Sequence, residues 1–267
     1  MHPTHESLAD RLRPLAVLLP IAALLVSAPL WLKSGEPQWF LAVNQACTAL
    51  PLAWWTYLSI WGTAWALLGA TAPLLVWHPR SFLAWLCAAP LAVAAVRIGK
   101  TFIFSPRPPD VLEHGSFALL GEALGTASMP SGHTLTAFTV ATALVFASAP
   151  ALRKRLYALW LLAALTGLSR VALGAHWPSD VLVGAGIGLL CGYLGAQWAR
   201  LINPARLQPQ SWTMRALAVL VALAAYNLLW DLVDFPEALV LQRALGGVAV
   251  VSLLAFAMRN ARTLKAS

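Results

Sequence analysis

A histidine and an aspartate in the sequence have the spacing of a nucleophile and its orienting carboxylate. His176 precedes Asp180 by four residues, in the stretch His-Trp-Pro-Ser-Asp. At that separation a carboxylate can reach one imidazole nitrogen, fix the tautomer and stabilise the charged ring. The other nitrogen is then a good nucleophile. The plainer alternative is a helix that begins here, with Asp180 in its first turn.

A second histidine follows a sequence that is suited to binding an anion. Pro130 ends a loop, Ser131 can cap the helix after it, and Gly132 lets a ligand approach the backbone. The exposed amides at such a helix start, next to His133, would form an anion site. For the tetrapeptide alone, a plain helix cap with an incidental histidine is an equal alternative.

Three cations accompany these groups. Lys100 and Arg107 are seven residues apart, and prolines on both sides of Arg107 should end the preceding helix and stiffen the chain. Arg170 follows Ser169 and precedes His176 by six residues. Isolated cations beside apolar segments usually extend to lipid headgroups. Here all three clusters map to one side of the helical bundle predicted below, which favours a common site over three separate accidents.

The composition indicates that membrane helices position these groups. Of the 267 residues, 60% are hydrophobic and only 10% are charged, whereas soluble domains carry about 25% charged residues. The net charge of +8 is spread over short gaps between apolar runs. That distribution fits membrane topology and anionic headgroups better than a nucleic-acid surface, so we expect no nucleic-acid partner.

Apolar runs of about 20 residues predict an all-α, polytopic membrane helix bundle. Eight spans are expected, at residues 14–32, 54–77, 82–104, 134–150, 156–173, 180–198, 214–230 and 238–258. We divide the chain into a six-helix core, residues 1–203, and a C-terminal extension with two further helices, residues 204–267.

Basic residues in alternate connections orient this bundle. Positive charge favours cytoplasmic loops, so both termini should be cytoplasmic and the histidines should face the periplasm from a bacterial inner membrane. The connection after the seventh span is acidic instead, with Asp231, Asp234 and Glu237, and we interpret it as a solvated turn. The basic residues are Arg11, Arg13, Arg80, Arg153, Lys154, Arg155, Arg200, Arg206, Arg215, Arg259, Arg262 and Lys265.

Together the three clusters resemble the signature of the type 2 phosphatidic acid phosphatase superfamily, in its membrane branch. That signature is Lys, six residues, Arg-Pro; then Pro-Ser-Gly-His; then Ser-Arg, five residues, His, three residues, Asp. The chain matches all eleven fixed positions and every internal spacing, from Lys100 to Asp180. Such a match is far more specific than a lone Gly-rich motif. The six-helix family core would cover most of residues 14–200, and the resemblance says nothing of the last two helices.

The resemblance implies catalysis through a phosphohistidine. His176 would attack phosphorus, Asp180 would orient His176, and His133 would protonate the leaving oxygen, after which water would release the phosphate. Phosphoryl transfer needs mainly positioning and neutralisation of negative charge, which fixed cations can supply. The phosphate oxygens would be held by Lys100, Arg107, Ser131, the Gly132 amide and Arg170.

Two residues beside the signature are expected to support the site without holding the transferred phosphate. Arg97 lies one turn deeper than Lys100 and could contact the site or the second phosphate of a substrate. Pairing with a helix carbonyl or a neighbouring polar group is an equal alternative for a cation inside a span. Ser169, next to Arg170, is the other expected supporting residue.

We expect no metal and no cofactor. A metal site built from His133, His176 and Asp180 is the alternative, but the nearby lysine and arginines would repel a divalent ion. The leading hypothesis is therefore a metal-independent lipid phosphatase, whose partners are the bilayer and a lipid phosphate. In a bacterium the resemblance suggests undecaprenyl diphosphate, lipid A phosphates, phosphatidylglycerophosphate or phosphatidic acid, and an outward-facing site favours the first.

Two other functions stay open at this point. A lipid phosphotransferase would pass the phosphate from the histidine to another lipid instead of to water. A transport or lipid-binding protein with a vestigial site would tolerate the loss of His176. The sequence indicates no oligomeric state.

Overall fold

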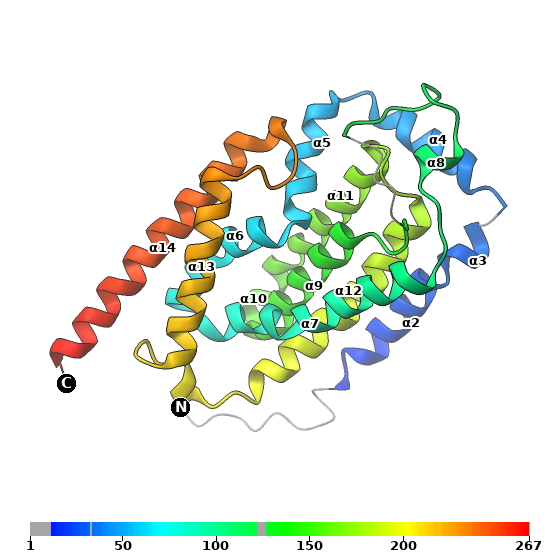
Figure 1. Cartoon of the computed structure of the whole chain (residues 1–267). Coiled ribbons are helices and arrows are strands. Elements are labelled where there is room, and N and C mark those ends of the chain that lie inside the picture. The colour runs from blue at the N-terminus through cyan, green and yellow to red at the C-terminus, as the bar shows by residue number, and fades with distance from the viewer. Residues whose placement is uncertain (1–11, 33, 122–126, 267) are drawn as a thin grey trace.

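The computed structural model describes residues 12–32, 34–121 and 127–266, and within them every regular element is a helix (Figure 1). The all-α prediction is therefore confirmed. The longer helices are α2 (Leu15–Val26), α4 (Glu36–Cys47), α5 (Leu52–Ser59), α6 (Ala64–Trp77), α7 (Pro79–Phe102), α9 (Gly132–Ala147), α11 (Ala158–Ala172), α12 (Pro178–Arg200), α13 (Trp212–Trp230) and α14 (Leu239–Ala266). The short ones are α3 (Ala28–Leu32), α8 (Pro108–Val111), α10 (Pro150–Leu156), η1 (Ile60–Gly62), η2 (Pro204–Leu207) and η3 (Pro236–Ala238).

Four helices form the centre of the bundle and bring the signature residues to one end. α9 and α12 pack on each other and on both α7 and α11, and α7 and α11 finish at the end where α9 and α12 begin. Lys100 and Arg170 lie in the last turns of α7 and α11. His133 and Asp180 lie in the first turns of α9 and α12. The topology alone therefore gathers the three sequence clusters.

Glycine residues let α12 approach α9 closely. A Cβ atom at Gly184 would lie 2.7 Å from the carbonyl oxygen of Ser131, and one at Gly188 would lie 2.6 Å from that of Leu135. A Cβ atom does not come so near a backbone oxygen, so only residues without a Cβ permit this helix contact. The Ser131 N–H also donates to the carbonyl of Asp180 at 3.0 Å. The starts of the two helices are thus held together.

The second expected span is broken in the structure. The sequence pattern predicts one helix over residues 54–77, but α5 and α6 are separated by η1 and bent by 63°. Thr63 is extended, and its hydroxyl caps α6 by accepting from the Ala66 N–H. A Cβ at Gly62 would lie 2.4 Å from Cβ of His133. The break therefore allows the chain to pass beside His133 and brings Ser59 to the same end.

A helix that the apolar pattern does not predict lies between the first two spans. In α4, the buried Asn44 donates to the carbonyl of Val171 at 3.0 Å and accepts from the Ala118 N–H at 2.8 Å. Glu36, at the start of α4, accepts from the Ser179 N–H at 2.8 Å and so caps α12. α4 thus fastens the ends of α11 and α12 that carry site residues.

Several helices have the length and apolar character of membrane spans, so the chain is a multi-pass membrane protein. By length and composition, four segments could cross a membrane, those containing α7, α12, α13 and α14. The bent α5–α6 pair would make a fifth. Because α2, α9 and α11 are shorter, the count of eight crossings stays a prediction.

Many of the basic residues lie at the opposite end of the bundle from the signature. Residues 153–155 lie in α10, and α14 finishes at the same end of the bundle (Figure 1). Arg80, at the start of α7, donates to the carbonyls of Ala199 and Ile202 at 2.6 and 3.2 Å and so caps α12. Arg11 and the N-terminus lie outside the described residues. The direction of the bundle in a membrane stays a prediction.

Candidate active site

His176 and Asp180 form a buried pair where α11 passes into α12. Nδ1 of His176 lies 3.3 Å from Oδ2 of Asp180, and the same oxygen accepts from the Trp177 N–H at 2.9 Å. His176 is 3% exposed and Asp180 is fully buried. A carboxylate only accepts hydrogen bonds, so Nδ1 carries the proton and Nε2 carries the lone pair. The sequence spacing had predicted this contact.

Ser128 is a third member of this group, and the sequence analysis missed it. Its hydroxyl lies 2.5 Å from Oδ2 of Asp180 and 3.3 Å from Nδ1 of His176, and the residue is fully buried. The Ser128 N–H donates to the carbonyl of Ser105 at 2.8 Å. In the sequence, Ser128 is visible only as a small polar residue shortly before Pro130. Many loops contain such a residue, so the sequence did not mark it as part of the site.

A tight turn after α11 presents His176. Gly174 has a φ of +76°, and a Cβ there would lie 2.7 Å from the carbonyl oxygen of Ala118. The following N–H groups, of Ala175 and His176, both donate to the carbonyl of Arg170 at 2.9 and 3.2 Å. Glycine is favoured here because left-handed backbone and close approach coincide. The spacing between Arg170 and His176 in the signature is the length of this turn.

Arg107 lies on the other side of the His176 ring. Its Nη1 donates to the carbonyl of Ala175 at 2.8 Å and lies 3.5 Å from Nε2 of His176. Arg107 is 3% exposed, and its backbone N–H donates to Oδ2 of Asp110 at 3.1 Å. The imidazole therefore has a carboxylate at one nitrogen and a guanidinium beside the other.

Arg170 and Lys100 complete the cluster of cations. Arg170 is 5% exposed, and its Nη1 donates to the hydroxyl of Ser59 at 2.6 Å. Lys100 lies close enough to Arg107, Asp180 and Arg170 for their charges to act on it. The three predicted phosphate-binding cations therefore meet at one end of the bundle, near His176.

Ser131, Gly132 and His133 form the first turn of α9, as the sequence pattern predicts. The Ser131 hydroxyl accepts from the N–H and hydroxyl of Thr134 at 3.5 and 2.9 Å. His133 is close enough to Arg170 and Lys100 for their charges to act on it. Backbone N–H groups at a helix start, with cations opposite, make a site for an anion.

The acidic connection after α13 is not the solvated turn that we expected. Oδ1 of Asp234 lies 3.6 Å from Nε2 of His133, and the Asp234 side chain is only 11% exposed. The ring of Phe235 lies 5.8 Å from the guanidinium carbon of Arg170. Of the three acidic residues, Asp231 and Glu237 are exposed and Asp234 is not. The solvated-turn interpretation fails for Asp234 because the two last helices pack on α6 and carry the connection to the site.

Burial is the main influence on the protonation of His176. It disfavours the charged ring, the charges of Arg107 and Arg170 act in the same direction, and Asp180 opposes them. Together they lower the pKa of His176 from 6.5 to about 4. At neutral pH the imidazole is therefore neutral and its Nε2 lone pair is available to a bound electrophile.

The structure separates the two expected supporting residues. Ser169 is fully buried, and its hydroxyl donates to the carbonyl of Thr166 at 2.6 Å, so it holds the last turn of α11. Arg97 is exposed on α7, and its carbonyl accepts from the Thr101 hydroxyl at 2.8 Å. A role for Arg97 toward a second phosphate stays a prediction.

The acidic and imidazole groups divide into two pairs rather than one cluster. His176 is paired with Asp180, and His133 is paired with Asp234. Among the residues that the structure describes, no three His, Cys, Asp or Glu side chains are grouped so that they could hold a metal ion. The geometry therefore gives no support to the alternative metal site built from both histidines and Asp180.

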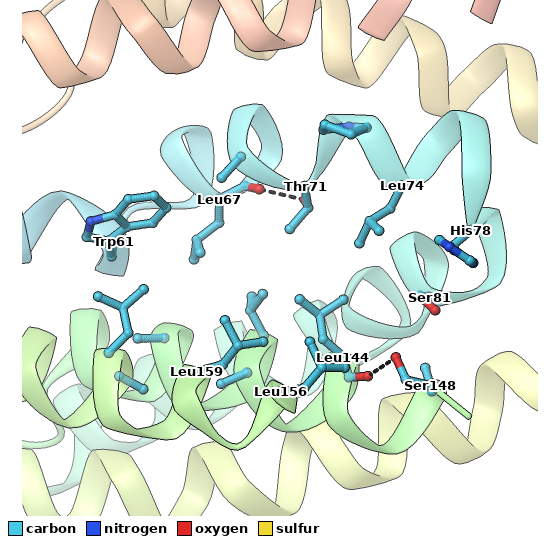
Figure 2. A pocket seen from close by; sticks show the side chains of 18 of the residues that line it. Trp61, Leu67, Thr71, Leu74, His78, Ser81, Leu144, Ser148, Leu156 and Leu159 are labelled. Carbon is cyan, nitrogen blue, oxygen red and sulfur yellow. Dashed lines mark hydrogen bonds between the residues drawn. The ribbon is translucent and has the colours of Figure 1, made fainter. Parts of the chain in front are cut away.

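An apolar cavity of about 560 Å³ runs beside the site between α6 and the pair α9 and α11 (Figure 2). Trp61 and Thr166 line it near the site, and His78 and Ser148 line it near the opposite end of the bundle. Most of the other lining side chains are leucine, alanine or valine. Ligand pockets commonly have volumes of about 300–1,000 Å³, so the cavity has the size and character to hold a hydrocarbon chain.

A family model described as the PAP2 superfamily matches residues 81–204, which include the whole signature. A segment of 75 residues, 27% of this chain and 16% of the relative, is 47% identical to a lipid A 1-phosphatase of Porphyromonas gingivalis. Another of 101 residues, 38% of this chain and 49% of the relative, is 34% identical to the undecaprenyl-diphosphatase BcrC of Bacillus subtilis. The chain thus spans about half or less of these curated relatives.

Two crystal structures share the fold. Aquifex aeolicus LpxE has a TM-score of 0.53 and 31% identity, over 60% of this chain and 93% of that one. A PAP2-type phosphatidylglycerolphosphate phosphatase from Bacillus subtilis has a TM-score of 0.51 and 23% identity, over 70% of this chain and 96% of that one. The fold, the site geometry and these similarities agree with the resemblance seen in the signature: the chain belongs to the PAP2 superfamily.

Proposed function

We propose that this protein is a metal-independent membrane lipid phosphatase that forms a phosphohistidine on His176. The observation that carries the proposal is the setting of the His176 ring. Nδ1 lies 3.3 Å from Asp180, and Nε2 lies 3.5 Å from the guanidinium of Arg107. The nucleophilic nitrogen thus points to the place where a cation would hold a phosphate oxygen.

In the first step, Nε2 of His176 attacks phosphorus and an N–P bond forms as the P–O bond to the lipid breaks. The leaving oxygen takes a proton from His133. Asp180 stabilises the positive charge that develops on the His176 ring, as a triad carboxylate does. Lys100 and Arg107 would neutralise the charge that spreads over the equatorial oxygens in the transition state.

In the second step, a water oxygen attacks phosphorus and the N–P bond breaks. The water proton passes to His133, which is then ready for the next cycle, and inorganic phosphate leaves. Arg170, Ser131 and the Gly132 amide would hold the phosphate in both steps. Apart from one water molecule, this sequence of steps needs only protein groups at the site end of the bundle.

The substrate class is a phosphate or diphosphate whose lipid tail stays in the bilayer. Undecaprenyl diphosphate is our first candidate, and lipid A and phosphatidylglycerophosphate are the alternatives. The similarity to relatives named for lipid A and for undecaprenyl diphosphate supports this set. The basic residues at the opposite end of the bundle support a site on the periplasmic face of an inner membrane, with cytoplasmic termini.

Phosphate release by the purified protein across a panel of these lipids, with His176→Ala as the control, tests the proposal. We expect release from at least one lipid and none from the variant. Activity that survives in the variant would contradict the mechanism. Phosphate that appears on a second lipid instead of in solution would show a phosphotransferase.

A further inference from the structure

The connection between α13 and α14 reaches the site end of the bundle and is rigidly built. Gln242 of α14 is fully buried, and its side chain donates to the carbonyls of Leu228 and Asp231 at 2.9 and 2.6 Å. It also accepts from the Val233 N–H at 3.0 Å. Three backbone groups are thus fixed by one side chain, and the last of them adjoins Asp234. The backbone next to Asp234 is therefore held in place by a side chain of α14.

Asp234 meets site residues from three other segments. Its Oδ1 lies 3.6 Å from Nε2 of His133 in α9, and Ser59 of α5 and Arg170 of α11 also interact with the carboxylate. Burial opposes ionisation, but the contacts with His133, Arg170 and Ser59 outweigh it and lower the pKa of Asp234 below its usual value. The carboxylate is therefore ionised at neutral pH beside the imidazole.

We infer that Asp234 is a positioning residue for His133, so that the C-terminal extension, residues 204–267, completes the active site of the PAP2 core. This inference rests on the proposed function. A carboxylate beside an imidazole fixes the orientation of the ring and stabilises the charge of its protonated form, which a general acid requires. At 3.6 Å the contact is longer than a hydrogen bond, and catalytic contacts often shorten when substrate binds.

The family match ends at residue 204, before α13 begins. The extension thus supplies a carboxylate to a site whose signature residues all lie inside the match. It also supplies Phe235, whose ring lies 5.8 Å from the guanidinium carbon of Arg170. Arg170 bonds Ser59 at 2.6 Å, so Ser59, Arg170 and Asp234 form one connected group around His133.

The test uses two substrates that differ in how much they need a general acid. The alcohol of an alkyl phosphate departs as a strongly basic alkoxide unless its oxygen is protonated, whereas the nitrophenolate of a nitrophenyl phosphate departs readily without a proton. If Asp234 acts through His133, Asp234→Asn should lower kcat/KM for the alkyl phosphate by about tenfold or more, because general acid catalysis contributes about 10²–10⁴ in rate. The value for the nitrophenyl phosphate should fall by less than about threefold.

Asp231→Asn is the matched control, because it makes the same change in the same connection at an exposed side chain. It should leave both substrates unchanged. Asp234→Glu keeps a carboxylate and should recover part of the alkyl phosphate activity. If Asp234→Asn does not yield folded protein, the ratio of the two substrates in Asp234→Glu serves the same purpose.

Equal losses on both substrates would assign Asp234 a merely structural role, and no loss on either would remove it from the site; both outcomes overturn the inference. The proposed function fails separately, if wild-type protein releases no phosphate from any lipid or if His176→Ala is as active as the wild type. An active wild type with an unaffected Asp234→Asn would therefore refute only the role of the extension.

Discussion

The hydroxyl of Ser128 donates a hydrogen bond to Oδ2 of Asp180, with the two oxygens 2.5 Å apart in a fully buried site. We predict that Ser128→Ala lowers kcat about tenfold, because a hydrogen bond to a charged group contributes about 1.5–3 kcal/mol and Asp180 keeps its contact with the Trp177 N–H. Steady-state kinetics on a lipid phosphate measures this. Ser116→Ala, an exposed serine in the same loop, is the control, and equal rates for both variants would contradict the prediction.

The pH dependence of kcat/KM should report the protonation of His176. Burial and the charges of Arg107 and Arg170 lower its pKa to about 4, so the acidic limb should fall near pH 4 instead of near the ordinary histidine value of about 6.5. The stability of the folded protein should also decrease as the pH falls. The unfolded chain takes up the proton at a higher pH than the folded chain, so stability is lost as the pH falls from about 6.5 towards 4.

Two measurements separate titration from unfolding. Protein held at acidic pH and assayed after return to neutral pH should regain full activity if His176 has merely been protonated. Asp180→Asn removes the group that raises the pKa of His176, so it should move the acidic limb to lower pH as well as reduce the rate. A limb near pH 6.5 in the wild type would show that the imidazole is not desolvated as the structure indicates.

A strong chelator should leave phosphate release unchanged. The charge of the transferred phosphate would be neutralised by Lys100, Arg107 and Arg170, which lie around His176, so we expect that no divalent ion is needed for this purpose. The assay is release from a lipid phosphate before and after incubation with EDTA. Activity that disappears and returns on addition of a divalent metal would overturn the metal-independent mechanism.

The apolar cavity should bind the tail of the substrate and not its phosphate. Ala70 of α6 lines the cavity, so Ala70→Phe should fill part of it and lower kcat/KM for a long-chain lipid phosphate. The loss should be roughly five- to tenfold, corresponding to about 1–1.4 kcal/mol of apolar contact. A soluble phosphate without a tail should be unaffected. Ala222→Phe, at an exposed position on α13, is the control, and equal behaviour of the two variants would exclude the cavity as a tail site.

The sequence was sufficient to predict the parts of the site that depend on local spacing. His176 and Asp180 are one helical turn apart, and Ser131 caps the helix that carries His133. Prolines also allowed helix ends to be predicted, for example the end of the helix that precedes Arg107. Successive membrane helices run in opposite directions across the bilayer. The order of the expected spans therefore placed these groups at one end of the bundle.

Contacts between distant segments were not accessible in this way. Asp234 was interpreted as a solvated residue, because no local pattern shows that α13 and α14 pack on α6 and bring their connection to His133. Ser128 lies 52 residues before its partner Asp180, too far for a local sequence pattern to link the two. The break at Gly62 was also missed, since an apolar run continues through it and only the close approach to His133 explains the glycine.

The covalent intermediate is the most direct test of the account. Protein incubated with a lipid carrying labelled phosphate, then quenched in alkali, should retain label on His176, since phosphohistidine survives base and is lost in acid. The label should be absent from His176→Ala. With a labelled nitrophenyl phosphate as substrate, the label should accumulate in His133→Ala, because hydrolysis of the phosphohistidine by water then lacks its general base. Label found equally in wild type and His176→Ala, or found on another residue, would contradict the central claim.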